Sequence, residues 1–198
     1  MTQIFLNYRS EDDEAFGVAM LDQALSDRFG DDAVFLASKS VELGSAWETD
    51  MFEAVKESSA LLVIMGRRWL DAKDENGGRR IDDPKDFVRR EILTALELGK
   101  KVIPVRLACK RLKADDLPEE LRPLISRQDI EVRFRNYRVD VELLAQRLRQ
   151  ELPELRKVAP SRTADGHGRK PVDSVTRIGN QFNGAFHFRD FNNYGPAD

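Results

Sequence analysis

The sequence predicts an α/β protein in which helices cover both faces of a parallel β-sheet. Short apolar runs alternate with amphipathic segments from residue 3 to residue 152, the pattern that specifies such a sheet. The run at 60–66, ALLVIMG, is uniformly apolar, as expected of a central strand buried on both faces. Ligands of such folds bind at the carboxyl ends of the strands, so a site is expected near the loops after Tyr8, Ala37, Gly66 and Leu107.

Five apolar runs are the predicted strands of this sheet. The last of them is the weakest and is expected at an edge. The runs cover residues 3–8, 33–37, 60–66, 100–107 and 128–134.

The segments between the strands have helical periodicity. The first helix is expected to bury Phe16, Met20, Ala24 and Leu25. The second is expected to bury Trp47, Met51, Ala54 and Val55. An amphipathic helix over 138–152 is expected to close the domain.

A further helix is predicted in DDPKDFVRREILTAL, residues 82–96, starting after Asp83. Its core-facing stripe consists of Val88, Ile92, Ala95 and Leu96. Phe87 and Glu91 belong to a second stripe, where an aromatic ring lies over a carboxylate four residues later. Two interpretations of Glu91 stay open: a solvated acid paired with Arg90 or Lys85, or a functional carboxylate in a cleft.

Composition excludes several classes of protein. The 198 residues are 41% hydrophobic and 34% charged with a net charge of −3, which suits a soluble globular protein and gives no basic face for nucleic acid. No apolar run is long enough to span a membrane. Cys109 is the single cysteine, so we expect no internal disulfide and a reducing cytoplasm. One cysteine and two histidines argue against a metal site.

The chain is divided by composition into three parts. A domain over 1–152 is followed by a flexible linker over 153–176, which is rich in Pro, Gly and charge. Residues 177–198 are rich in Gly, Asn and Phe, unlike a packed domain. An Asn-Gly pair flanked by aromatic residues is a hairpin signal, and Phe and Asn ladders occur in cross-β assemblies. An assembly motif and a disordered tail both stay open.

Familiar nucleotide-binding and hydrolytic signatures are missing. The sequence has neither a G-x-x-x-x-G-K-[ST] loop nor a G-x-G-x-x-G turn after the first strand. A receiver-type domain is excluded because Met65, Gly66 and Arg67 stand where its phosphate-accepting Asp is required. No nucleophile elbow is present.

The ordered set IFLNYRSEDD, VFLASKSVELGSAW, ALLVIMGRRWLDA, DDPKDFVRREILTALELGKKVIPV and LPEELRPL resembles a bacterial Toll/interleukin-1 receptor (TIR) domain over residues 1–151. The resemblance implies a flavodoxin-like fold with five parallel strands. It also implies cleavage of NAD⁺ at the nicotinamide–ribose bond, with NAD⁺ as substrate and no cofactor. The family's catalytic glutamate follows an aromatic residue by four positions, which points to Glu91 after Phe87.

Other site residues follow from the same resemblance. Phe87 would bind the substrate by packing against its nicotinamide or ribose. Tyr8 and Arg9 match the family's SYR box and are expected at the substrate site. Arg9 would contact a phosphate or be a surface arginine, and Tyr8 would be mainly structural. Many active relatives have an acid where this chain has Ala37, and Lys39 and Ser40 in the following interaction loop would substitute in part.

The resemblance further implies self-association, since a neighbour's interaction loop completes the site in this family. The tail resembles short amyloid-like signalling motifs, which implies a receptor protein with a matching tail as a partner. The expected function is an NAD⁺ hydrolase of bacterial anti-phage immunity that assembly activates. The alternative is a non-catalytic module that signals through TIR–TIR contacts.

Overall fold

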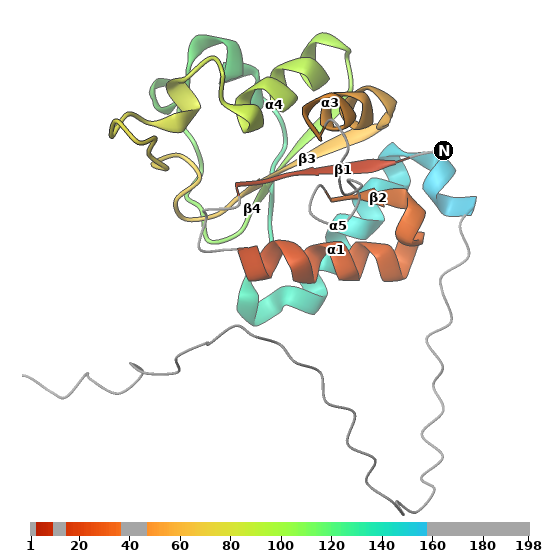
Figure 1. The fold of residues 1–198 in the computed structure, drawn as a ribbon. Helices are drawn as coiled ribbons and strands as arrows, with labels where there is room; N and C mark the ends of the chain where they lie inside the picture. The colour runs from red at the N-terminus through yellow and green to blue at the C-terminus, as the bar shows by residue number, and fades with distance from the viewer. Residues whose placement is uncertain (1–2, 10–14, 37–46, 158–198) are drawn as a thin grey trace, which may run out of the picture. The chain divides into compact units, whose positions relative to one another are not determined.

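The computed structural model describes residues 3–9, 15–36 and 47–157, and these form a parallel α/β fold (Figure 1). Five parallel strands form one sheet in the order β2-β1-β3-β4-β5, which confirms the predicted fold class. The strands are β1 (Ile4–Asn7), β2 (Val34–Phe35), β3 (Ala60–Met65), β4 (Lys101–Arg106) and β5 (Ile130–Glu131).

The middle of the sheet follows the prediction more closely than its edges. β3 is central, is fully buried, and pairs with β1 on one side and β4 on the other. β5 lies at an edge as predicted, but only Ile130 and Glu131 pair, opposite Val105 and Arg106. The expected strand over 128–134 was therefore too long, because an edge strand has a partner on one side only.

Helices pack on both faces of the sheet (Figure 1). α1 (Ala15–Phe29) and α5 (Tyr137–Glu151) cover one face, and α3 (Trp47–Glu57) and α4 (Phe87–Glu97) cover the other. The predicted inward residues Met51, Ala54 and Val55 of α3 are buried. The side chain of Trp47 lies outside the described residues.

The predicted apolar face of α1 was wrong at Phe16, whose side chain is 73% exposed. The buried stripe of α1 is rotated from the expected one and comprises Val18, Leu21, Leu25 and Phe29. Both stripes have helical spacing, so periodicity alone could not choose between them.

The predicted start of α4 was also wrong. The helix begins at Phe87, and the side chain of its N-cap residue Asp86 accepts a hydrogen bond from the backbone N–H of Arg89 at 2.9 Å. Asp83 instead accepts the backbone N–H of Lys85, in a turn ahead of the helix. Two aspartates compete for the same role, and Asp86 caps the helix.

The described body continues five residues past the predicted boundary at 152. Pro153–Lys157 forms a 3₁₀ turn, and Leu155 is buried against the core beneath α1 and α5. The predicted linker start at 153 is therefore too early. The remainder of the linker and the 177–198 tail lie outside the described residues. Within the described ranges, no helix has the length and apolar character that crossing a bilayer requires.

Candidate active site

Glu91 lies on the inward side of α4 and is only 4% exposed. Its carboxylate Oε2 accepts a hydrogen bond from Asn7 Nδ2 at 2.6 Å. No cation among the residues that the structure describes forms an ion pair with this carboxylate. The interpretation of Glu91 as a solvated helix acid is therefore wrong. Arg90, one of its expected partners, pairs instead with Glu48 at 2.7 Å.

Asn7 is the residue that sequence reasoning missed. It ends β1, is fully buried, and lies at the carboxyl edge of the sheet where ligands of this fold class bind. Its Nδ2 also donates to the backbone carbonyl of Val88 at 3.2 Å, while its Oδ1 is buried with no partner among the described residues. A polar residue at the end of an apolar strand was the available signal.

Burial gives the carboxyl group of Glu91 unusual titration behaviour. Desolvation raises its pKa from an ordinary 4.5 to about 7, the Asn7 hydrogen bond opposes the rise, and the nearby charge of Asp86 adds to it. A carboxyl group that titrates near neutral pH is a common property of functional sites.

Arg9 is buried, with 2% exposure, and its guanidinium is engaged inside the protein. Its Nη1 and Nη2 donate to the two carboxylate oxygens of Asp86 at 2.8 and 3.0 Å, and its Nε donates to the carbonyl of Trp69 at 2.9 Å. The interpretation of Arg9 as a surface arginine is therefore wrong. Its contact with a substrate phosphate stays a prediction.

Phe87 opens α4 and is half-buried one helical turn before Glu91. The guanidinium of Arg90 lies over its ring, 5.5 Å from the centroid, and over the ring of Phe52 at 4.4 Å. This arrangement joins α4 to α3 beside the candidate site. Contact between Phe87 and a substrate stays a prediction.

The other predicted substrate-binding residues do not gather around Glu91 in the described part of the structure. Tyr8 packs against the core beneath α1 and α5, on the other face of the sheet. Its contact with a substrate stays a prediction. Lys39, Ser40 and Ala37 lie outside the described residues, so their predicted roles stay predictions.

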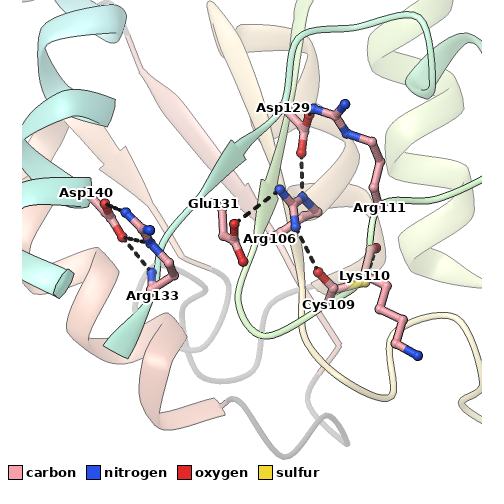
Figure 2. Close-up of polar contacts among 8 residues, drawn as sticks. All are labelled: Arg106, Cys109, Lys110, Arg111, Asp129, Glu131, Arg133 and Asp140. Atoms are coloured by element: carbon pink, nitrogen blue, oxygen red, sulfur yellow. Dashed lines mark hydrogen bonds and ion pairs between the residues drawn. The ribbon is translucent and has the colours of Figure 1, made fainter. Parts of the chain in front are cut away.

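A second group of charged residues lies at the ends of β4 and β5 (Figure 2). Arg106 forms an ion pair with Asp129, donates to the carbonyl of Cys109 at 3.1 Å, and reaches Glu131 at 3.5 Å. Burial alone would raise the pKa of Asp129, but hydrogen bonds from Arg106 and Arg111 outweigh it and lower the pKa. These pairs keep the acid ionised and join the strand ends, which is a structural role.

The described part of the chain contains no candidate metal-binding site. No group of three or more His, Cys, Asp or Glu side chains there is arranged to hold a metal ion. Cys109 follows β4 and is half-buried, with its Sγ 3.2 Å from the carbonyl oxygen of Lys110.

The strand order and the buried acid beside the end of β1 define a flavodoxin-like α/β protein with a candidate site at the carboxyl edge of its sheet. The family model of the TIR domain matches residues 4–145. The chain belongs to the TIR domain family.

The solved structures that are similar to this chain include two with TIR domains. The TIR domains of the activated Roq1 resistosome, which directly recognises the pathogen effector XopQ, align with a TM-score of 0.53 and 16% identity over 77% of this chain and 99% of that chain. A metazoan TIR-STING receptor from C. gigas in complex with 2′,3′-cGAMP aligns with a TM-score of 0.48 and 19% identity, over 72% of this chain and 39% of that chain. No curated protein matches the chain in sequence.

Proposed function

We propose that this protein cleaves NAD⁺ at the nicotinamide–ribose bond, with Glu91 as the catalytic residue. The observation that carries the proposal is the burial of the Glu91 carboxylate beside the end of β1, where it accepts from an amide donor and pairs with no cation of the described residues. A carboxylate that no cation neutralises is free to stabilise a positive charge that develops on a substrate. Its place at the carboxyl edge of the sheet is where this fold class binds ligands.

The chemistry requires little beyond such an anion. Nicotinamide in NAD⁺ is cationic and departs as a neutral molecule, so its departure needs no general acid. The bond to the anomeric carbon breaks with its electron pair moving to nicotinamide, which leaves an oxocarbenium-like ribosyl cation. The Glu91 carboxylate stabilises that cation. Water then adds to the anomeric carbon and loses a proton to give ADP-ribose, whereas attack by an adenine nitrogen or a ribose hydroxyl gives a cyclic isomer.

The protonation state of Glu91 decides whether it can act in this way. Only the ionised carboxylate stabilises a cation, and the pKa of Glu91 is about 7. We therefore expect kcat/KM to rise with pH through the neutral range and to level off above it. A free surface glutamate would give no such change above pH 6.

We infer further that assembly activates the enzyme and that it acts in bacterial anti-phage immunity, in the cytoplasm. Self-association would bring the interaction loop of a second copy, with Lys39 and Ser40, to the edge of the sheet that holds Glu91. The 177–198 tail would promote assembly or bind a receptor protein with a matching tail. The proposal includes neither a nucleic acid nor a membrane as partner, and neither a cofactor nor a metal.

The test is product analysis from NAD⁺ incubated with the full chain, dilute and after clustering of a His-tagged form on nickel-chelating vesicles. Chromatography should detect nicotinamide together with ADP-ribose or a cyclic isomer. Glu91→Gln should abolish the products, while Glu97→Gln, an exposed acid on the same helix, should not. Intact NAD⁺ under every clustering condition would favour the alternative, a non-catalytic TIR–TIR interaction module.

A further inference from the structure

We infer that Asn7 is a positioning residue for Glu91: its amide is locked with an N–H toward the carboxylate, which favours the ionised form and fixes the orientation of the carboxylate. The inference rests on the proposed function for its catalytic consequence. The contacts that carry it are those of Asn7 Nδ2 with Glu91 Oε2 at 2.6 Å and with the Val88 carbonyl at 3.2 Å.

The Val88 carbonyl sets the orientation of the Asn7 amide. A backbone carbonyl only accepts hydrogen bonds, so the NH₂ group of Asn7, and not its oxygen, must face Val88. The same NH₂ group then meets Glu91. Turning the amide over would place its oxygen against the carbonyl and the carboxylate, three acceptors with no donor between them. Glu91 is therefore offered a donor, the partner that an ionised carboxylate prefers.

A second contact from β1 supports the same geometry. Arg9, two residues after Asn7, forms the two-bond ion pair with Asp86, the N-cap residue of α4. Asn7 at the end of β1 and Arg9 just after it thus hold α4 at Glu91 and at its N-cap residue, one turn earlier. Because Asn7 and Arg9 alternate with Tyr8, both point to the α4 face while Tyr8 packs on the other.

Among the described residues, no other charged group near Glu91 stabilises its ionised carboxylate, so Asn7 is the partner that does. On α4, Asp86 raises the pKa of Glu91 by like charge, although Arg9 and Arg80 pair with it. Arg90 is engaged by Glu48 of α3. Against desolvation and a like charge, the Asn7 hydrogen bond is the influence that favours ionisation.

The test is the titration of Glu91 in Asn7 variants. The ¹³C carboxyl resonance of Glu91, assigned by its loss in Glu91→Gln, is followed against pH in the wild type, Asn7→Ala and Asn7→Asp. Asn7→Ala removes the donor alone, whereas Asn7→Asp keeps the shape but replaces the donor with a carboxylate whose like charge adds to the upward shift. Asn76→Ala, on an exposed loop, is the control. A hydrogen bond to a charged group corresponds to a shift of about one pH unit or more, so both variants should titrate at least that much higher.

Activity provides the second readout. With NAD⁺ and clustered protein, the pH profile of kcat/KM should move upward in Asn7→Ala by the same shift. The loss at pH 7 should be about fivefold or more and should diminish at high pH. A purely structural role would lower the rate equally at every pH.

An unchanged Glu91 titration in folded Asn7→Ala or Asn7→Asp would overturn the inference. If both variants unfold, Asn7→Leu, which has a similar shape but no hydrogen-bond donor, replaces them under the same criterion. The titration needs no turnover: a shifted resonance in a protein that never cleaves NAD⁺ would refute the proposed function and leave the positioning by Asn7 standing.

Discussion

Replacing Glu91 by Gln should stabilise the protein at pH 8 while abolishing its proposed activity. Gln has the shape of the acid and keeps an oxygen that accepts the Asn7 hydrogen bond, but it carries no charge to desolvate. The wild type ionises a carboxyl group that is 4% exposed and has no cation on it among the described residues. The free energy of unfolding should therefore increase in the variant wherever wild-type Glu91 is ionised.

The pKa of Glu91 fixes the magnitude and the sign. It rises from 4.5 to about 7 on folding, so between these values the folded state binds more protons than the unfolded state. Wild-type stability must then fall as the pH rises from 4.5 to 7, with no cost below this range and the full cost above it. At about 1.4 kcal/mol per pH unit, the full cost is about 3 kcal/mol.

The assay is urea unfolding of the wild type and Glu91→Gln at pH 5 and pH 8, followed by the fluorescence of buried Trp69. Subtracting the two proteins at each pH cancels the titration of all other groups. The advantage of the variant should grow by about 2 to 3 kcal/mol from pH 5 to pH 8. Glu97→Gln, an exposed acid at the end of α4, is the matched control, and its effect should stay within about 0.5 kcal/mol at both pH values.

Two results would refute this reasoning. An advantage of Glu91→Gln that is equal at pH 5 and pH 8 would mean that Glu91 keeps an ordinary pKa in the folded state. A variant less stable than the wild type at pH 8 would mean that the charge itself stabilises the fold, through a partner beyond the described residues.

Three further predictions concern stability. Arg9→Ala should lower the free energy of unfolding by about 3 to 5 kcal/mol, because it removes the buried two-bond partner of Asp86 and leaves only the longer Arg80 contact at 3.4 Å; a loss below 1 kcal/mol in urea unfolding would contradict the buried pair. Ala108→Gly should stabilise by about 0.5 to 1 kcal/mol, since Ala108 has a positive φ of 58° that glycine adopts without strain, and an unchanged or lower melting temperature would argue against that strain. Phe16→Ser should change stability by less than about 0.5 kcal/mol, whereas Leu21→Ala should cost about 2 to 5 kcal/mol; the reverse order would restore the stripe predicted from the sequence.

The sequence was sufficient for the fold because the relevant signals are local. The apolar run at 60–66 identified the central strand, and the alternation of strands and helices specified the parallel sheet. The predictions failed where two local signals competed. Phe16 and Val18 belong to two stripes of α1 that are both helically spaced, and only packing against the sheet decides which is buried.

The contacts of the candidate site were beyond local reasoning. Glu91 was identified through the resemblance, but its burial depends on Asn7, 84 positions earlier in the chain. The buried pair of Arg9 with Asp86 spans 77 positions. The site contains four polar residues of types that usually lie on the surface: Asn7, Arg9, Asp86 and Glu91. Each of them is buried together with a hydrogen-bonding partner from the same group.

Two other carboxylates of this fold are paired with arginines and serve as examples of structural acids. Asp129 accepts from Arg106 and Arg111, and Asp86 accepts two hydrogen bonds from Arg9. Glu91 is as buried as Asp86, yet it receives a single amide donor. Its pKa rises, whereas the pKa of Asp129 falls. Packing alone does not require this charge, since a glutamine would fill the same space at lower cost. A buried anion that lowers stability at the ligand-binding edge of a parallel sheet is best explained by chemistry that needs a negative charge there, because natural proteins tolerate such local costs chiefly at functional sites.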